Sequence, residues 1–213
     1  MIVMPSNNSS MHLGWLAGTY PGRIGWLLGP SGWRTPHHWL PYGCDNDRFS
    51  AAVKGTQWDE VGYEAMLAHA VAMSKIGRAP KWILVPDVPF DAEATLVEWR
   101  KWAPRLAEYG WPLAIAVQDG MTQRDVPSDA AVVFVGGSTE WKWKTVWNWC
   151  ANNKRVHVGR VNGYRTLWHC HDAGAESCDG TGWFRGDQEQ LAGLERYLRE
   201  STHDGRAQAR LVS

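Results

Sequence analysis

The chain has 213 residues, which suits one domain of good size. Hydrophobic residues make up 44% and charged residues 21%, as in an ordinary globular protein, and the formal net charge is zero. No overall field therefore draws the protein to nucleic acid, so any such binding needs a local patch. No apolar run approaches the ~20 residues that span a bilayer, and no apolar signal core is present, so we expect a cytoplasmic protein without membrane contact.

The two ends of the chain differ from the part between them. Residues 1–11 look like a loose leader, and we expect them to be flexible. Residues 201–213 are polar, which predicts a flexible tail. We therefore expect one folded domain at 12–200.

Short apolar runs that end at turn residues recur along the chain and predict strands. They lie at 24–28, 82–85, 112–117, 131–135, 156–158 and 175–178, with one more before the polar turn 41–49. Apolar residues at helical spacing predict helices between these runs. The expected starts of these helices are Thr56, Asp91, Ser138 and Asp187, with a further helix around Tyr164–His171. Pro104 predicts a kink or a break in the second of them.

The alternation of strands and helices indicates the class of fold. Short strands that are apolar on both faces, with helices between them, are typical of parallel βαβ units. About seven strands favour a small (β/α)8 barrel of the TIM type, complete or incomplete, although such barrels usually have ~250 residues. A doubly wound open sheet is the alternative, and no G-x-G-x-x-G motif follows any strand.

Polar residues and glycines follow the predicted strands at six successive ends. They are Asp45, Asn46, Asp87, Gln118, Gly136, Gly137, Arg160 and Asp179. In a parallel barrel all of these positions lie on the face where the strands end, which carries the chemistry. A turn explains any one of them alone, but the whole series favours a site.

The residue types suggest what this site does. Asp179 precedes Gly180 at a strand end, and a carboxylate there can attack a sugar carbon. Gln118 both donates and accepts, which matches an amide-like heterocycle edge. Gly136 and Gly137 let the backbone approach a flat ligand and offer its N–H groups.

A second feature is the stretch 141–171, which mixes basic and tryptophan side chains and contains no Asp or Glu. Lys142, Lys144 and Arg165 are the candidates for contact with a nucleic-acid backbone. A solvated helix face over a tryptophan-filled core explains the same pattern equally well. The spacing of His169, His171 and Cys178 is not a strong zinc pattern, so we expect no metal.

The strand-end motifs together resemble the tRNA-guanine transglycosylase superfamily, and above all its short phage and bacterial members that act on 7-deazaguanine in DNA. The similar segments lie between Pro41 and Arg185: Cys44–Phe49, Ile83–Asp87, Val117–Gly120, Val135–Gly137, Val156–Arg160 and Gly174–Asp179. The resemblance implies a (β/α)8 barrel and a glycosyltransferase that exchanges a base through a covalent sugar–enzyme intermediate.

The resemblance also implies residue roles. Asp179 would be the nucleophile and Asp45 the general acid and base. The side chains that bind the target guanine or the incoming 7-deazaguanine, such as preQ0, would be Asp87, Gln118, Gly136, Gly137, Asn46 and Arg160. The family's zinc motif C-x-C-x-x-C and an appended RNA-binding domain are absent, which implies no cofactor and favours DNA over tRNA.

Other functions stay open at this point. They are an enzyme of this type that acts on tRNA, a barrel that binds nucleic acid without catalysis, and a sugar-phosphate enzyme with a phosphate grip at Gly180-Thr-Gly182. A homodimer also stays open.

Overall fold

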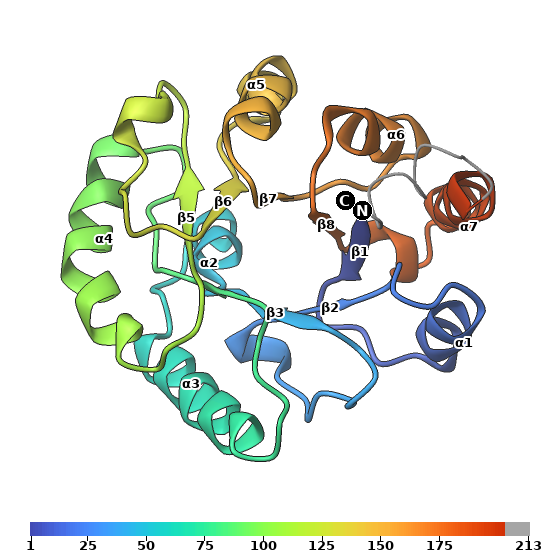
Figure 1. Ribbon diagram of the computed structural model, residues 1–213, viewed down its shortest axis with the longest axis horizontal. Helices are drawn as coiled ribbons and strands as arrows, with labels where there is room; N and C mark the ends of the chain where they lie inside the picture. The colour runs from blue at the N-terminus through green and yellow to red at the C-terminus, as the bar shows by residue number, and fades with distance from the viewer. Residues whose placement is uncertain (203–213) are drawn as a thin grey trace.

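The computed structural model describes residues 1–202, which form one barrel of eight parallel strands (Figure 1). The strands are β1 (Ile2–Pro5), β2 (Trp26–Leu28), β3 (Tyr42–Cys44), β4 (Ile83–Leu84), β5 (Leu113–Val117), β6 (Val132–Val135), β7 (Val156–Val158) and β8 (Ser177–Gly180). Their order in the sheet is β1-β8-β7-β6-β5-β4-β3-β2. Two isolated parallel bridges, Val3 with Ile24 and Ser6 with Leu27, join β1 to the β2 side, so the barrel is nearly closed. The predicted small (β/α)8 barrel is confirmed.

The helices, apart from the short one at Arg48–Lys54 that lies inside the ring, form an incomplete outer ring (Figure 1). They are α1 (Met11–Thr19), α2 (Arg48–Lys54), α3 (Glu60–Ser74), α4 (Ala92–Ala107), α5 (Thr139–Asn152), α6 (Tyr164–Ala173) and α7 (Gln188–Thr202). After β2 and β5 the chain makes only the short 3-10 turns η1 (Pro30–Gly32) and η2 (Gln123–Asp125), and η3 (Gly182–Phe184) precedes α7. These two shortened connections explain how 213 residues suffice for the fold.

The predicted flexible leader is wrong, because residues 2–5 are the first strand of the barrel. β1 pairs with β8 in the register Ile2–Ser177 to Pro5–Gly180, and Val3 and Met4 are fully buried. Without β1, the edges of β2 and β8 would expose unpaired backbone groups. A four-residue strand next to the polar run Ser6–Ser10 carries too little periodicity to be found in the sequence.

Several helix boundaries also differ from the prediction. α1 begins inside the expected leader, with Ser10 as its N-cap. α3 begins after Asp59, whose carboxylate accepts the N–H of Gly62, and not at Thr56. α4 continues through Pro104 to Ala107 without a break. Among the described residues 1–202, no helix is both long and apolar enough to cross a bilayer.

The first two residues of the predicted flexible tail belong to a helix instead. Ser201 and Thr202 belong to α7, and Ser201 is fully buried, with its Oγ 2.7 Å from an Nη of Arg23. The rest of the predicted tail, 203–213, lies outside the described residues.

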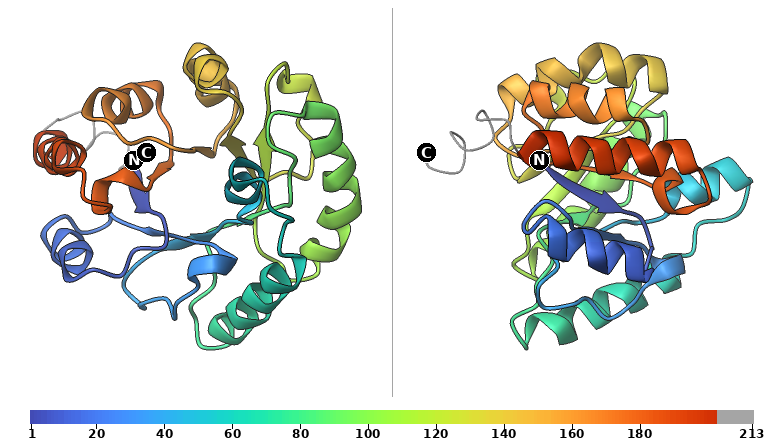
Figure 2. Two further views of the ribbon diagram at one scale, coloured as in Figure 1. Left: turned by 180° about the vertical axis from the view of Figure 1, so that it is seen from behind. Right: turned by 90° about the vertical axis from the view of Figure 1, so that its right-hand side faces the viewer.

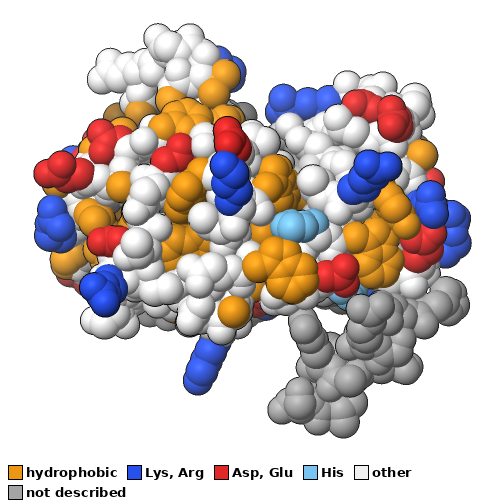
Figure 3. Space-filling view, turned by 90° about the horizontal axis from the view of Figure 1, so that it is seen from above, with side chains coloured by type: hydrophobic (Ala, Val, Ile, Leu, Met, Phe, Trp, Pro, Cys, Tyr) orange, Lys and Arg blue, Asp and Glu red, His pale blue; other side chains and the backbone are white. Residues whose placement is uncertain are grey.

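The outer side over α5 and α6 mixes hydrophobic, basic and acidic side chains (Figure 3). On α5, Trp149 is buried against the barrel, whereas Trp147 is 49% exposed. Lys144 on the same helix forms an ion pair with Glu140 at 2.6 Å. The basic residues of the stretch 141–171 therefore do not form one continuous positive surface.

The inside of the barrel is packed, and a cavity remains at the carboxyl ends of the strands. Its apolar contents are Met4, Leu27, Trp82, Leu84, Ala114, Ala116 and Val132. Trp82 fills the centre so closely that a Cβ on Gly43 would lie 2.6 Å from the indole ring. The remaining space lies above Leu84, Ala116 and Phe134, at the carboxyl ends of the strands. α2 projects from this end of the barrel (Figure 2).

Candidate active site

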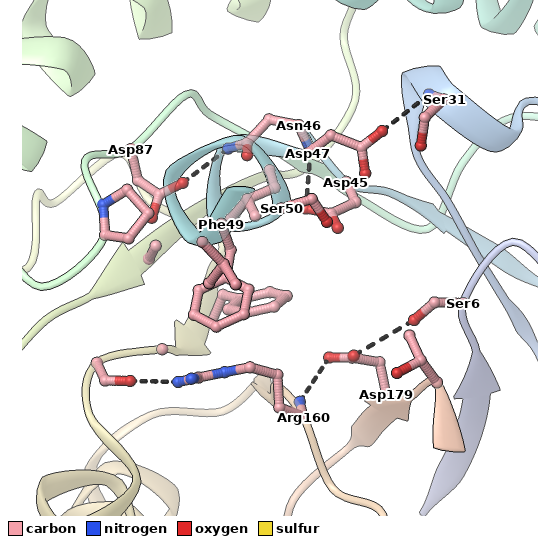
Figure 4. A pocket seen from close by; sticks show the side chains of 18 of the residues that line it. Ser6, Ser31, Asp45, Asn46, Asp47, Phe49, Ser50, Asp87, Arg160 and Asp179 are labelled. Carbon is pink, nitrogen blue, oxygen red and sulfur yellow. Dashed lines mark hydrogen bonds between the residues drawn. The ribbon is translucent and has the colours of Figure 1, made fainter. Parts of the chain in front are cut away.

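A cavity of about 320 Å³ opens at the carboxyl ends of the strands (Figure 4). All eight side chains and glycines that the sequence places at strand ends line it: Asp45, Asn46, Asp87, Gln118, Gly136, Gly137, Arg160 and Asp179. They come from six strands and converge because parallel strands end on one face of a barrel. The volume is in the range of small-molecule sites.

Asp179 lies on the inward side of β8 and is 5% exposed, toward the cavity. Its Oδ1 accepts the backbone N–H of Arg160 at 3.2 Å, and its Oδ2 accepts the hydroxyl of Ser6 at 3.4 Å. A third neighbour, His157 Nε2, lies 3.1 Å from Oδ1. These contacts hold the carboxylate in one orientation at the cavity wall.

Asp45 follows β3 and faces the same cavity. Burial raises the pKa of this carboxyl well above its usual value, and the nearby carboxylates of Asp47 and Asp179 raise it further. The N–H of Asn46, 2.8 Å from Oδ1, opposes this effect only in part. Asp45 thus keeps a proton to higher pH than an ordinary aspartate, which suits a group that gives and takes protons.

Asp87 is the centre of a buried polar network. Its Oδ1 accepts from Asn46 Nδ2 at 2.9 Å, and its Oδ2 accepts from Gln118 Nε2 at 2.7 Å. Burial raises the pKa of Asp87, although both amides favour its charged form. Asn46 also donates to Val85 O at 3.1 Å, so both of its N–H groups are used and it acts by orienting Asp87.

The two glycines at the end of β6 do not offer their N–H groups to a ligand, contrary to the prediction. Gly136 donates to Val117 O at 3.1 Å, and Gly137 donates to Gln118 Oε1 at 3.1 Å. Gly137 has φ +62°, and a Cβ there would lie 2.5 Å from Asp119 Oδ1. Close packing of the strand end therefore requires this glycine.

Arg160 has a left-handed backbone conformation, with φ +57°, at the end of β7. Its guanidinium lies over the ring of Phe49, 4.3 Å from the centroid, and donates to Gly137 O. The predicted contact between Lys142 and a nucleic-acid backbone is wrong, because Lys142 is 1% exposed. Its Nζ donates to Gly159 O at 2.6 Å and Arg160 O at 3.3 Å, which holds this turn in place. Burial, with repulsion from Arg160, lowers the pKa of Lys142 to about 8.

The other two predicted backbone contacts lie on the surface away from the cavity. Lys144 and Arg165 are exposed, on α5 and α6, and neither lines the cavity. The cations that do line it, besides Arg160, are Lys54 at the end of α2 and Arg185 after η3. Sequence reasoning missed both because nothing in their local pattern distinguishes them from other surface cations.

Sequence reasoning also missed Ser6 and His157. Ser6 follows β1, in the stretch 1–11 for which the sequence predicts a flexible leader. His157 is fully buried between Val156 and Val158 on β7, and its alternation with these two valines was the available signal that it points into the barrel.

Comparisons with known proteins support the fold. No protein-family model and no curated protein matches the chain. Among solved structures, the chain is similar to a 3-hexulose-6-phosphate synthase (11% identity, 93% of this chain and 99% of that chain, TM-score 0.49). It is also similar to a structure described as native KDPGal (12%, 94% and 95%, TM-score 0.50) and to the Amycolatopsis orientalis BexX/CysO complex (15%, 92% and 90%, TM-score 0.51). At these identities, the likeness of the last two shows a shared barrel and nothing about the reaction.

Proposed function

We propose that this protein is a base-exchange transglycosylase that replaces guanine in DNA with a 7-deazaguanine such as preQ0. The observation that carries the proposal is the meeting of Asp45, Asp87, Gln118 and Asp179 around one cavity. This exchange needs three groups. They are a carboxylate held by hydrogen-bond donors (Asp179), a second carboxyl with a raised pKa (Asp45) and a hydrogen-bond acceptor held in place by amides (Asp87). The resemblance of the strand-end motifs to the transglycosylases gives the reaction class.

The first half of the reaction uses the two carboxyl groups in different ways. The target guanine leaves the base stack and enters the cavity. An oxygen of Asp179 forms a bond to C1′ of the sugar while the C1′–N9 bond breaks, and its electron pair goes to the base. Asp45 gives its proton to the departing guanine, an assistance typically worth about 10²–10⁴-fold.

The second half reverses these steps with another base. The incoming 7-deazaguanine gives a proton to Asp45, and its ring nitrogen attacks C1′. The bond between C1′ and Asp179 breaks, and the carboxylate is restored. Exchange therefore needs no redox step and no other co-reactant.

The base edge is assigned to Asp87 and Gln118. Asp87 accepts from the guanine N–H groups, and Gln118 has one N–H left after it donates to Asp87. Phe49 and Phe90 line the cavity, with ring centroids 5.9 Å apart, and provide an apolar wall for the flat ring. Arg160 lies against Phe49 and supports that wall.

We assign the binding of the DNA phosphates to the cavity mouth and not to α5. Lys54 and Arg185 line the cavity, and among residues 1–202 neither has an ion-pair partner. By contrast, Lys144 is already paired with Glu140. A nucleotide whose sugar lies at Asp179 brings its phosphates to this mouth, where two cations are available.

The direct test is exchange of labelled guanine or preQ0 into DNA by the wild-type protein and by Asp179→Asn. We expect exchange and a covalent protein–DNA adduct on a denaturing gel for the wild type, and neither for the variant. Asp91→Asn, an exposed N-cap substitution on α4, is the matched control and should exchange normally. Exchange into tRNA instead of DNA would mean that the substrate is tRNA. Salt-sensitive DNA binding without any adduct would favour the non-catalytic barrel.

A further inference from the structure

A buried histidine, His157, contacts the proposed nucleophile Asp179 from the interior of the barrel. His157 Nε2 lies 3.1 Å from Asp179 Oδ1, and His157 Nδ1 lies 2.8 Å from Ser177 Oγ. His157 and Ser177 pair in the register of β7 and β8, and Asp179 follows Ser177 by two residues. Since side chains two apart on a strand share a face, all three point into the barrel.

The imidazole ring has no freedom to turn away. It stacks on Phe134, 4.7 Å between centroids, and lies 4.8 Å from the Trp82 ring on another side. His157 is fully buried and Ser177 is 1% exposed, so water does not compete for either contact. Neither residue lines the cavity, whereas Asp179 does.

We propose that His157 is the positioning residue of the nucleophile, with Nε2–H donating to Asp179 Oδ1 and Ser177 holding Nδ1. This inference rests on the proposed function. Oδ1 then has two donors, Nε2–H and the backbone N–H of Arg160, whereas within residues 1–202 Oδ2 has only the hydroxyl of Ser6 at 3.4 Å. Oδ2 is the less firmly held oxygen and is the one that attacks C1′.

The two hydrogen bonds to Oδ1 also stabilise the states that follow the nucleophilic attack. When the bond between Oδ2 and C1′ forms, Oδ1 becomes the carbonyl oxygen of the ester and still accepts from both N–H groups. When the incoming base displaces Asp179, negative charge returns to the carboxylate, and the same donors stabilise it. His157 therefore accelerates formation and breakdown of the adduct without touching the base.

The first test reads the proton directly and needs no activity. Nitrogen-15 NMR of the histidine-labelled free protein distinguishes a protonated from a bare Nε2, and His157→Gln assigns the signals by their loss. We expect His157 with hydrogen on Nε2. A bare Nε2, with the hydrogen on Nδ1, overturns the proposal.

The second test is kinetic. His157→Leu fills the space but removes both nitrogens, and we expect adduct formation to slow by about 10²-fold, because a displaced nucleophile loses its alignment. Affinity for the free 7-deazaguanine base should stay unchanged, since His157 does not line the cavity. His157→Gln, which keeps an N–H donor, should recover part of the rate.

Ser177→Ala removes the hydroxyl with little change in packing, so it tests the same hydrogen bonds if His157→Leu does not fold. It should slow the adduct step and lower the share of Nε2–H seen by NMR, while His69→Leu on the exposed side of α3 should change neither. An adduct rate equal to wild type in folded His157→Leu overturns the inference. Absence of any adduct in the wild type sinks the proposed function instead, and the NMR result still decides the hydrogen bond.

Discussion

Asp45 and Asp179 line one cavity from strands β3 and β8, which β2 and β1 separate in the barrel. Asp179 is held by N–H and O–H donors, whereas burial and neighbouring carboxylates raise the pKa of Asp45. Two carboxyl groups in different surroundings divide into an acid and a nucleophile. The environment of each side chain therefore supports the two roles that the proposed exchange needs.

Asp45→Asn should lose exchange but gain stability above acidic pH. A carboxyl whose pKa is raised by folding binds protons more tightly in the folded state, so its contribution to stability falls as pH rises through the raised pKa. Asparagine carries no such penalty. Thermal unfolding from pH 4 to 8 should therefore show an advantage of the variant that grows with pH and disappears in acid. A variant that is less stable at pH 8 would contradict this account.

Gln118→Ala should destabilise the fold as well as weaken base binding. Its Oε1 accepts from Phe90 N at 2.9 Å and Gly137 N at 3.1 Å, and its Nε2 donates to Asp87. Leaving buried donors unsatisfied costs about 1–3 kcal/mol, and we expect a loss of this size in the free energy of unfolding. Urea unfolding measures it. Gln188→Ala, an exposed amide at the start of α7, is the control and should change little.

Lys54→Ala and Arg185→Ala should each weaken DNA binding and lower the slope of log K against log salt by about 1. Both cations line the cavity mouth. Lys144→Ala and Arg165→Ala remove equal charge from α5 and α6, so they control for a general effect of net charge. Fluorescence anisotropy over a salt series measures the slopes. Larger effects from Lys144→Ala and Arg165→Ala would mean that DNA binds on the outer face over α5 and α6.

Deleting residues 1–10 should prevent folding. The truncation removes β1, with its buried Val3 and Met4, and exposes the edges of β2 and β8. Circular dichroism and size-exclusion chromatography should show an unfolded or aggregated chain. A folded, monomeric product would mean that β1 is dispensable, as a flexible leader would be.

The sequence was sufficient to predict the barrel and the strand-end residues that line its cavity. Apolar runs such as Leu113–Val117 mark buried strands by local pattern alone, and the residue that follows a strand must lie at the carboxyl-end face. Asp87 and Gln118 could therefore be placed at the same cavity without coordinates. β1 escaped because its pairing with β8 spans more than 170 residues and leaves almost no local trace.

The tertiary structure decided how the polar groups are used. The N–H of Gly137 is not free for a ligand, because it donates to Gln118, 19 residues away in the sequence. Lys142 does not reach solvent, because its ammonium group donates to the carbonyls of Gly159 and Arg160. The contact between His157 and Asp179 arises from the register of β7 and β8. Local pattern sets which face of an element a side chain takes, but hydrogen-bond partners and burial are set by elements distant in sequence, and only the closed barrel brings those together.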